Sequence, residues 1–139
     1  LDVTIQAQIL ELMQRLSTEL GTAILVITHN LGVVARYAHR VNVMYAGRII
    51  ERGSAMDIYK NPKHPYTLGL LASVPRLDEA IREKLDPIQG MPPDLINLPE
   101  GCPFRPRCTH AIDRCSTEYP TLDSVGEGHT AACWVSETL

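Results

Sequence analysis

Four cysteines are the residues of this chain best suited to chemistry. They lie in the last third of the 139 residues, at Cys102, Cys108, Cys115 and Cys133. An even number would suit two disulfides in a secreted protein, but the chain begins with neither a basic region nor a hydrophobic signal core. With a reducing cytosol as the expected compartment, metal binding is the better interpretation of these thiols.

The spacing of the cysteines, C-x5-C-x6-C-x17-C, helps to distinguish between two kinds of metal site, a zinc site and an iron-sulfur cluster. Structural zinc usually involves a tight C-x2-4-C pair, because two thiolates must converge on one small ion. No such pair occurs here, and wider loops suit an iron-sulfur cubane, whose irons point outward at separate corners. Arginines 105, 107 and 114 lie between the cysteines and would favour a negative cluster, although solvated arginines would look the same. The sequence therefore predicts a [4Fe-4S] cluster, with zinc as the alternative and with His110 and His129 able to replace a cysteine.

Upstream, the pattern predicts a helix followed by a buried strand. Apolar residues from Thr4 to Leu20 follow helical spacing, and Gly21 supplies the stop. The run 22–28 is continuously apolar and β-branched, which is typical of a strand buried on both faces of a parallel α/β sheet. His29 would then stand at the carboxyl end of a strand, where open α/β sheets bind ligands.

Shorter elements follow. The pattern predicts a helix over 31–38, an antiparallel hairpin of 41–45 with 48–52, and a helix over 53–59. After a proline-marked break, Pro65 would begin a helix over 66–73, and a charged helix is expected over 77–85. Residues 86–106 are rich in proline and should lack regular structure, yet they are apolar enough to pack against the preceding domain.

Two parts of the N-terminal half resemble a known family. Leu1-Asp2, the following helix and the segment ILVITHN resemble the end of the nucleotide-binding domain of ABC transporters. Leu1-Asp2 matches the end of the family's D-loop, and His29 matches its switch histidine. Residues 43–53 resemble the hairpin that closes this domain. The chain runs from Leu1 straight into a helix, so we expect it to be a fragment of a longer protein.

The C-terminal half of the chain resembles a narrower group of proteins within this family. The segments NPKHPYT, G-x-P-P and L-P-x-G-C-x-F-x-P-R-C look like the C-terminal region of oligopeptide and dipeptide transporter ATPases. The resemblance implies an α/β fold: residues 1–60 as the C-terminal part of an ABC-type P-loop ATPase domain, and 61–139 as a loop-rich, cysteine-containing extension. It implies a [4Fe-4S] cluster on the four cysteines. We interpret His64 as the first residue of a helix in a proline turn rather than as a catalytic group.

The resemblance also implies a function. The parent protein would bind ATP and Mg²⁺ and energise peptide import, with His29 contacting the γ-phosphate and orienting water. Asp2 would couple the two ATP sites across a dimer. The implied partners are a second ATPase subunit, membrane permease subunits and, indirectly, a peptide-binding protein. The implied location is peripheral, on the cytoplasmic face of the cell membrane.

Several features limit these expectations. The chain contains no G-x-x-x-x-G-K-[ST] phosphate loop, and the Walker B and signature motifs would lie upstream. We therefore predict that this chain alone neither binds ATP usefully nor hydrolyses it, and that it is marginally stable or depends on partners. The alternative function is a stand-alone metal-binding interaction module. A net charge of −3 and the lack of a basic or aromatic stripe argue against a nucleic-acid partner.

Overall fold

The computed structural model describes residues 3–73 and 87–139. These residues belong to two compact units, 1–38 and 39–139, which are considered separately below. Asp2 and the charged helix expected over 77–85 lie outside the described residues. The division at residue 60, drawn from the family resemblance, stays a prediction.

The first unit contains the two helices that the sequence predicts. Helix α1 spans Val3–Leu20 and ends at Gly21, whose φ of 63° is in the left-handed region that glycine adopts easily. Helix α2 spans Leu31–Tyr37, and the Asn30 side chain accepts hydrogen bonds from its first turn. The apolar stripe of α1 is 42–47% exposed at Ile5, Ile9, Leu12 and Leu16.

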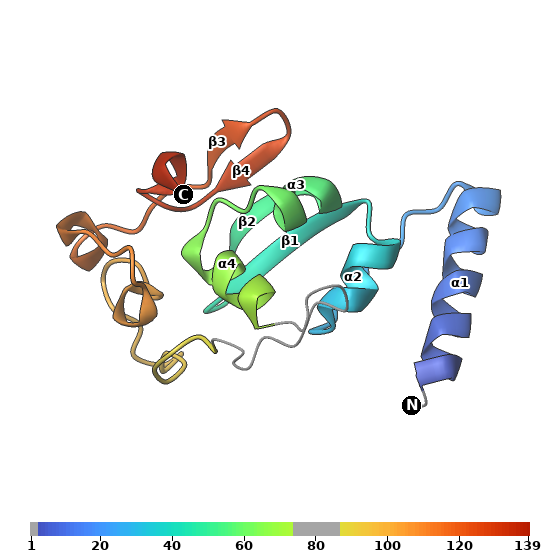
Figure 1. Cartoon of the computed structure of the whole chain (residues 1–139), viewed down its shortest axis with the longest axis horizontal. Helices are drawn as coiled ribbons and strands as arrows, with labels where there is room; N and C mark the ends of the chain where they lie inside the picture. Colours follow the sequence, from blue (N-terminus) through green and yellow to red (C-terminus); the bar gives the residue numbers. More distant parts are fainter. Residues whose placement is uncertain (1–2, 74–86) are drawn as a thin grey trace, which may run out of the picture. The chain divides into compact units, whose positions relative to one another are not determined.

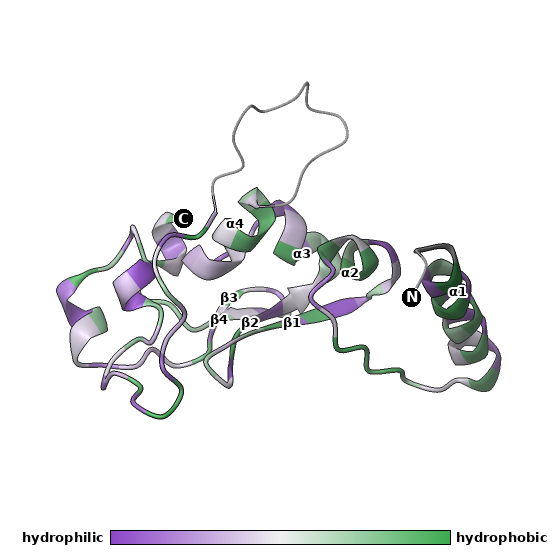
Figure 2. Cartoon of the chain, turned by 90° about the horizontal axis from the view of Figure 1, so that it is seen from below, coloured by the Kyte–Doolittle hydropathy of each residue, from purple (hydrophilic) through white to green (hydrophobic). Residues whose placement is uncertain are grey.

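The strand predicted between these helices is wrong. Residues 22–28 form neither helix nor strand, and Leu25 and Ile27 are 82% and 91% exposed. Figure 2 colours most of this segment as hydrophobic. A strand buried on both faces needs neighbours that satisfy its backbone hydrogen bonds. Among the described residues, all strands of the sheet come from other segments of the chain, and residues 22–28 pair with none of them.

The second unit is built on a four-stranded antiparallel sheet, and the parallel sheet expected around residues 22–28 is not found among the described residues. Its strands are β1 (Arg40–Tyr45), β2 (Arg48–Ser54), β3 (Asp123–Gly126) and β4 (His129–Ala131), in the order β1-β2-β4-β3. Ala46 and Gly47, with φ of 48° and 77°, form the two-residue turn of the predicted first hairpin, which is confirmed. The β3–β4 hairpin was not predicted, because its strands have only four and three residues, too few to show an alternating pattern.

Two short helices lie on one side of the first hairpin (Figures 1 and 2). They are α3 (Ala55–Lys60) and α4 (Pro65–Ala72), both predicted from the sequence. The core between them and the sheet contains Val43, Tyr45, Ile50, Ile58 and Phe104. The Phe104 ring meets the Tyr45 ring edge-on at 5.2 Å, so the first cysteine loop is attached directly to the core.

The proline-rich segment lacks helix and strand from residue 87 to residue 104, as predicted. Its expected packing is confirmed at Ile88, which contacts the core, but Met91, Leu95 and Ile96 are 66–90% exposed. Three short 3-10 helices follow: η1 (Arg105–Arg107), η2 (Asp113–Ser116) and η3 (Ser136–Thr138). Within the part of the chain that the structure describes, no helix has the length and hydropathy needed to cross a bilayer.

Candidate functional site

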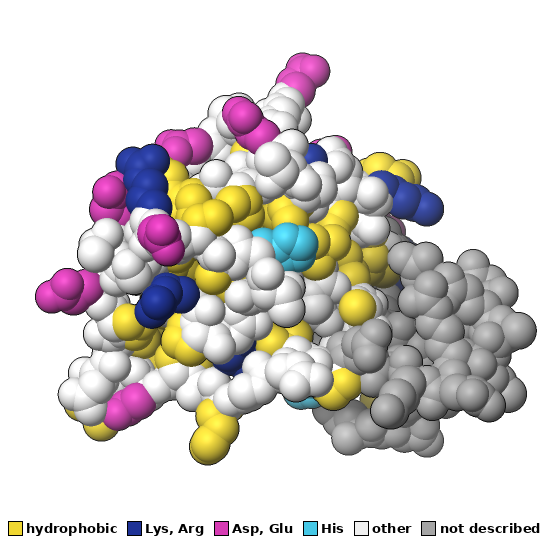
Figure 3. Space-filling model, turned by 60° about the vertical axis from the view of Figure 1, so that its left-hand side comes forward, with side chains coloured by type: hydrophobic (Ala, Val, Ile, Leu, Met, Phe, Trp, Pro, Cys, Tyr) yellow, Lys and Arg dark blue, Asp and Glu magenta, His cyan; other side chains and the backbone are white. Residues whose placement is uncertain are grey.

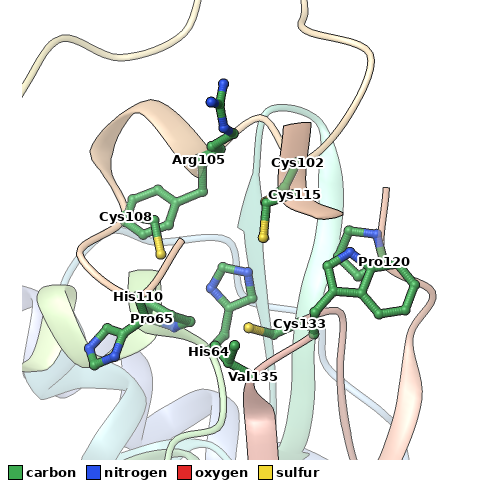
Figure 4. Close-up of a pocket in the computed structure, with 12 residues that line it drawn as sticks. His64, Pro65, Cys102, Arg105, Cys108, His110, Cys115, Pro120, Cys133 and Val135 are labelled. Carbon is green, nitrogen blue, oxygen red and sulfur yellow. The ribbon is translucent and has the colours of Figure 1, made fainter. Parts of the chain in front are cut away.

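The four predicted cysteines line one pocket of the second unit. Cys102 precedes η1, Cys108 follows it, Cys115 lies within η2, and Cys133 follows β4. The side chains of Cys108, Cys115 and Cys133 point toward a common space (Figure 4). Three loops that are separate in sequence therefore contribute to one site, which we call the cysteine pocket.

Backbone contacts hold these loops together. The N–H of Cys102 donates to the carbonyl of Cys115 at 2.9 Å, which joins the first and second loops. The N–H of Ala132 donates to the carbonyl of Ile50 at 2.8 Å, which fixes the chain next to Cys133 against β2. The sheet and the core thus place every cysteine loop, although the loops themselves have little regular structure.

Backbone N–H groups also face three of the sulfurs. The N–H groups of Phe104 and Arg105 act to lower the pKa of Cys102, and that of Val135 acts to lower the pKa of Cys133. The N–H of His110 acts in the same way on Cys108. Each of these three thiols thus has an N–H two residues ahead that favours the thiolate form, which is the form that metals bind.

Burial opposes these hydrogen bonds and is the larger effect. Burial raises the pKa of Cys102 and of Cys108, and it raises the pKa of Cys133 to about 11. The other cysteines add to the increase, because neighbouring thiolates repel one another. At neutral pH these thiols carry protons, so metal binding must release them.

His64 lies in the cysteine pocket, which the sequence did not predict. It begins α4 as expected, since its Nδ1 accepts the N–H of Tyr66 at 3.0 Å. The side chain is only 2% exposed, and burial lowers its pKa to about 4. Figure 4 shows the ring beside the sulfurs of Cys108, Cys115 and Cys133, at the wall of the same pocket. No spacing in the sequence relates this residue to the cysteines.

The arginines between the cysteines are engaged elsewhere. Arg107 donates to the carbonyls of Ile88 and Gln89, and Arg114 donates to Glu118. The guanidinium of Arg114 also lies 3.5 Å from the centroid of the Trp134 ring. Arg105 lines the pocket, but its guanidinium points away from the sulfurs (Figure 4). In the view of Figure 3, basic side chains are scattered among acidic and hydrophobic ones. The charge argument for a cluster therefore loses its support.

The two histidines considered as replacement ligands differ. His110 lines the cysteine pocket and is exposed. His129 does not line the pocket, and its Nε2 lies 2.8 Å from Oε1 of the buried Glu51. His129 therefore contacts Glu51 within the sheet rather than the cysteines.

The donor set has the chemistry of a metal site, but the side chains are not arranged around an ion. All four cysteines are free thiols. Across residues 3–73 and 87–139, no group of three or more His, Cys, Asp or Glu side chains is positioned to hold a metal ion. The fit to a metal group rests on four thiols around one pocket and on the backbone N–H groups near three of them.

His29 belongs to the first unit and is exposed. It lies in the bend before α2, where the Thr28 hydroxyl accepts the N–H of Asn30 at 3.0 Å. This exposed position leaves the imidazole accessible to a ligand.

Comparison with known protein families shows which family part of this chain matches. Residues 50–115 match the family described as "Oligopeptide/dipeptide transporter, C-terminal region". This match includes His64 and the first three cysteines.

The similarity to individual proteins extends further along the chain. A peptide import ATP-binding protein of Brucella ovis is 56% identical in an alignment of 138 positions that covers 96% of this chain and 41% of that protein. OppD of Salmonella typhimurium, an oligopeptide transport ATP-binding protein, is 52% identical over 96% of this chain and 39% of its own length. DppD of Bacillus subtilis, a dipeptide transport ATP-binding protein, is 50% identical over 99% and 41%. The chain thus spans about two fifths of the length of these relatives, and it belongs to the C-terminal region of the oligopeptide/dipeptide ABC transporter ATP-binding proteins.

Proposed function

We propose that this chain is part of the ATP-hydrolysing subunit that energises the import of dipeptides or oligopeptides by an ABC transporter. The observation that carries the proposal is the 50–56% identity along nearly the whole chain to proteins named for peptide import. The parent protein would bind ATP with Mg²⁺. It would act at the cytoplasmic face of the cell membrane with a second ATPase subunit, permease subunits and, indirectly, a peptide-binding protein.

Within this function, Asp2 and His29 are the residues that would serve the nucleotide. An imidazole can donate a hydrogen bond to a phosphate oxygen and help orient the attacking water, and the exposed position of His29 suits that role. Asp2 would couple the two sites of an ATPase dimer. The phosphate-binding loop is absent from this sequence, so the chain alone should not hydrolyse ATP.

A chimera tests the transport proposal. The matching C-terminal region of Salmonella OppD is replaced by this chain, and oligopeptide uptake is measured in cells that lack their own OppD. We expect uptake to be restored, and His29→Ala in the chimera to abolish it while His39→Ala, next to the first hairpin, does not. A well-expressed, membrane-associated chimera without uptake would support the alternative, a stand-alone metal-binding module.

We further propose that the cysteine pocket holds a [4Fe-4S] cluster through Cys102, Cys108, Cys115 and Cys133, with zinc as the alternative. The support is the convergence of four free thiols on one pocket, with backbone N–H groups facing three of them. When bound, a cluster with four cysteine ligands supplies a cross-link rather than an open Lewis-acid site. The role that fits is to join three loops of little regular structure.

Anaerobic reconstitution of the full chain with iron and sulfide tests the metal assignment. We expect absorption near ~400 nm and iron bound together with sulfide. Cys115→Ser should lose most of this absorption, whereas His110→Ala, which removes a side chain of the same pocket, should keep it. Metal analysis showing zinc alone, without this absorption, would overturn the iron assignment.

A further inference from the structure

Among the described residues that line the cysteine pocket, His64 is the one buried polar side chain that the proposals above do not use. It lies beside the sulfurs, and it is held there from two sides. The backbone N–H of Tyr66 fixes Nδ1 at 3.0 Å, and the Phe104 ring lies 5.8 Å from the imidazole between ring centroids. A side chain that is 2% exposed and held in this way presents one defined edge to the pocket.

The hydrogen bond at Nδ1 determines which nitrogen carries the proton. A backbone N–H can only donate, so Nδ1 must be the acceptor and cannot itself be protonated. An imidazole ring carries a proton on at least one of its two nitrogens. Because Nδ1 is the acceptor, that proton is on Nε2, which makes Nε2–H a hydrogen-bond donor.

The same argument excludes His64 as a metal ligand. A histidine that binds a metal through one nitrogen normally donates the N–H of the other to a neighbour. If Nε2 bound a metal here, Nδ1 would need a proton and would face the N–H of Tyr66, donor against donor. His64 can therefore donate to a sulfur or to a sulfide, but it cannot replace a cysteine.

We propose that His64 is a positioning residue of the cysteine pocket, whose Nε2–H donates a hydrogen bond to sulfur and adjusts the electronic properties of the bound cluster. This inference rests on the proposed iron-sulfur site. Hydrogen bonds to the sulfurs are among the factors that set the reduction potential of such clusters, because they stabilise the more negative, reduced form. Removing the donor should lower the potential.

Two substitutions separate this role from the helix-start role of the same residue. In His64→Asn, the side-chain oxygen can still accept the N–H of Tyr66, so α4 keeps its cap, but the side chain is too short to reach the sulfurs. In His64→Gln, the amide nitrogen can take the place of Nε2, while the cap is lost. A purely structural role predicts that Gln is the more damaging change for every property.

The experiment uses the full chain reconstituted anaerobically with iron and sulfide, with a redox titration and the Fe–S stretching frequencies from resonance Raman spectra. For His64→Asn we expect normal cluster content, shifted Fe–S frequencies and a lower potential. At the wild-type midpoint the reduced fraction relative to the oxidised one should fall about tenfold, equivalent to about 59 mV. His64→Gln should stay near the wild-type potential and frequencies but unfold at lower urea concentration.

The outcomes distinguish the two proposals. A wild-type chain that takes up no iron-sulfur cluster overturns the proposed site and this inference with it. A loaded wild-type chain whose potential and Fe–S frequencies are unchanged in His64→Asn overturns only the role of His64. If the cluster resists reduction, the Raman frequencies alone decide, since hydrogen bonding to sulfur alters the Fe–S bond in the oxidised state too.

Discussion

The Glu51 carboxylate and the His129 imidazole meet at 2.8 Å inside the second unit, where their side chains are 0% and 3% exposed. The same Oε1 of Glu51 accepts the backbone N–H of Lys63 at 2.6 Å. Glu51 therefore joins β2 to the segment before His64 and to the strand before Cys133. Through these two contacts, one buried carboxylate holds two sides of the cysteine pocket.

Replacing Glu51 by Ala should lower the free energy of unfolding by about 3 kcal/mol, because the buried His129 and the partly buried N–H of Lys63 lose their acceptor at once. Urea denaturation of the metal-free chain measures this loss. Glu127→Ala is the control: this glutamate is exposed in the turn of the β3–β4 hairpin, and its removal should change stability by less than about 0.5 kcal/mol. Equal midpoints for the two variants would contradict the linking role of Glu51.

Gly101 should tolerate no side chain, because it lies where the first two cysteine loops touch. A methyl group there would collide with the carbonyl oxygen of Cys115 and lie 2.7 Å from a backbone carbon of Ser116. Gly101→Ala should cost about 1–3 kcal/mol and reduce iron uptake by the cysteine pocket. Gly126→Ala meets His129 at an ordinary 3.6 Å and should behave like the wild type. Normal iron uptake by Gly101→Ala would show that the loops do not need this contact.

Arg107 should control the mobility of the proline-rich segment. Its guanidinium donates to the carbonyls of Ile88 and Gln89 at 3.1 and 3.0 Å. Arg107→Ala leaves these carbonyls without their donor, so proteolytic cleavage within 87–98 should become several-fold faster. Arg105→Ala removes an exposed side chain and should leave the rate unchanged. Equal cleavage rates in the two variants would mean that Ile88 alone anchors the segment.

Ser54 and Asp57 make a pH-dependent contribution to the stability of the fold at the start of α3. The Asp57 N–H donates to the Ser54 hydroxyl, and this hydroxyl donates to the Asp57 carboxylate at 2.6 Å, which lowers the pKa of Asp57 below 3.8. The ionised carboxylate therefore stabilises the fold above pH 3.8, and this contribution is lost as the pH falls through the lowered pKa.

Ser54→Ala should raise the pKa of Asp57 toward 3.8, followed by NMR titration of its carboxyl carbon. Loss of the helix cap should also cost about 1 kcal/mol near neutral pH. Ser124→Ala, at an exposed strand position, is the matched control and should leave this pKa in place. An unchanged Asp57 titration in Ser54→Ala would rule out the hydroxyl as its cause.

Local signals in the sequence predicted the elements that depend on neighbours in the chain. Gly21 ends α1, the Ala46-Gly47 turn joins β1 to β2, and Pro65 begins α4, all as expected. Such signals act over a few residues, so they do not require knowledge of the rest of the molecule. The run 22–28 shows the limit, because an apolar segment becomes a strand only where another strand is present to pair with it.

The four cysteines were identifiable as a set from the sequence, because their confinement to one part of the chain is itself unusual. Only the tertiary structure decided that they share their pocket with His64, that His129 is engaged by Glu51, and that Arg107 and Arg114 are bonded elsewhere. Spacing along a chain says nothing about contacts between residues that are far apart in sequence. Those contacts follow from how the hairpins, the short helices and Phe104 pack into one core.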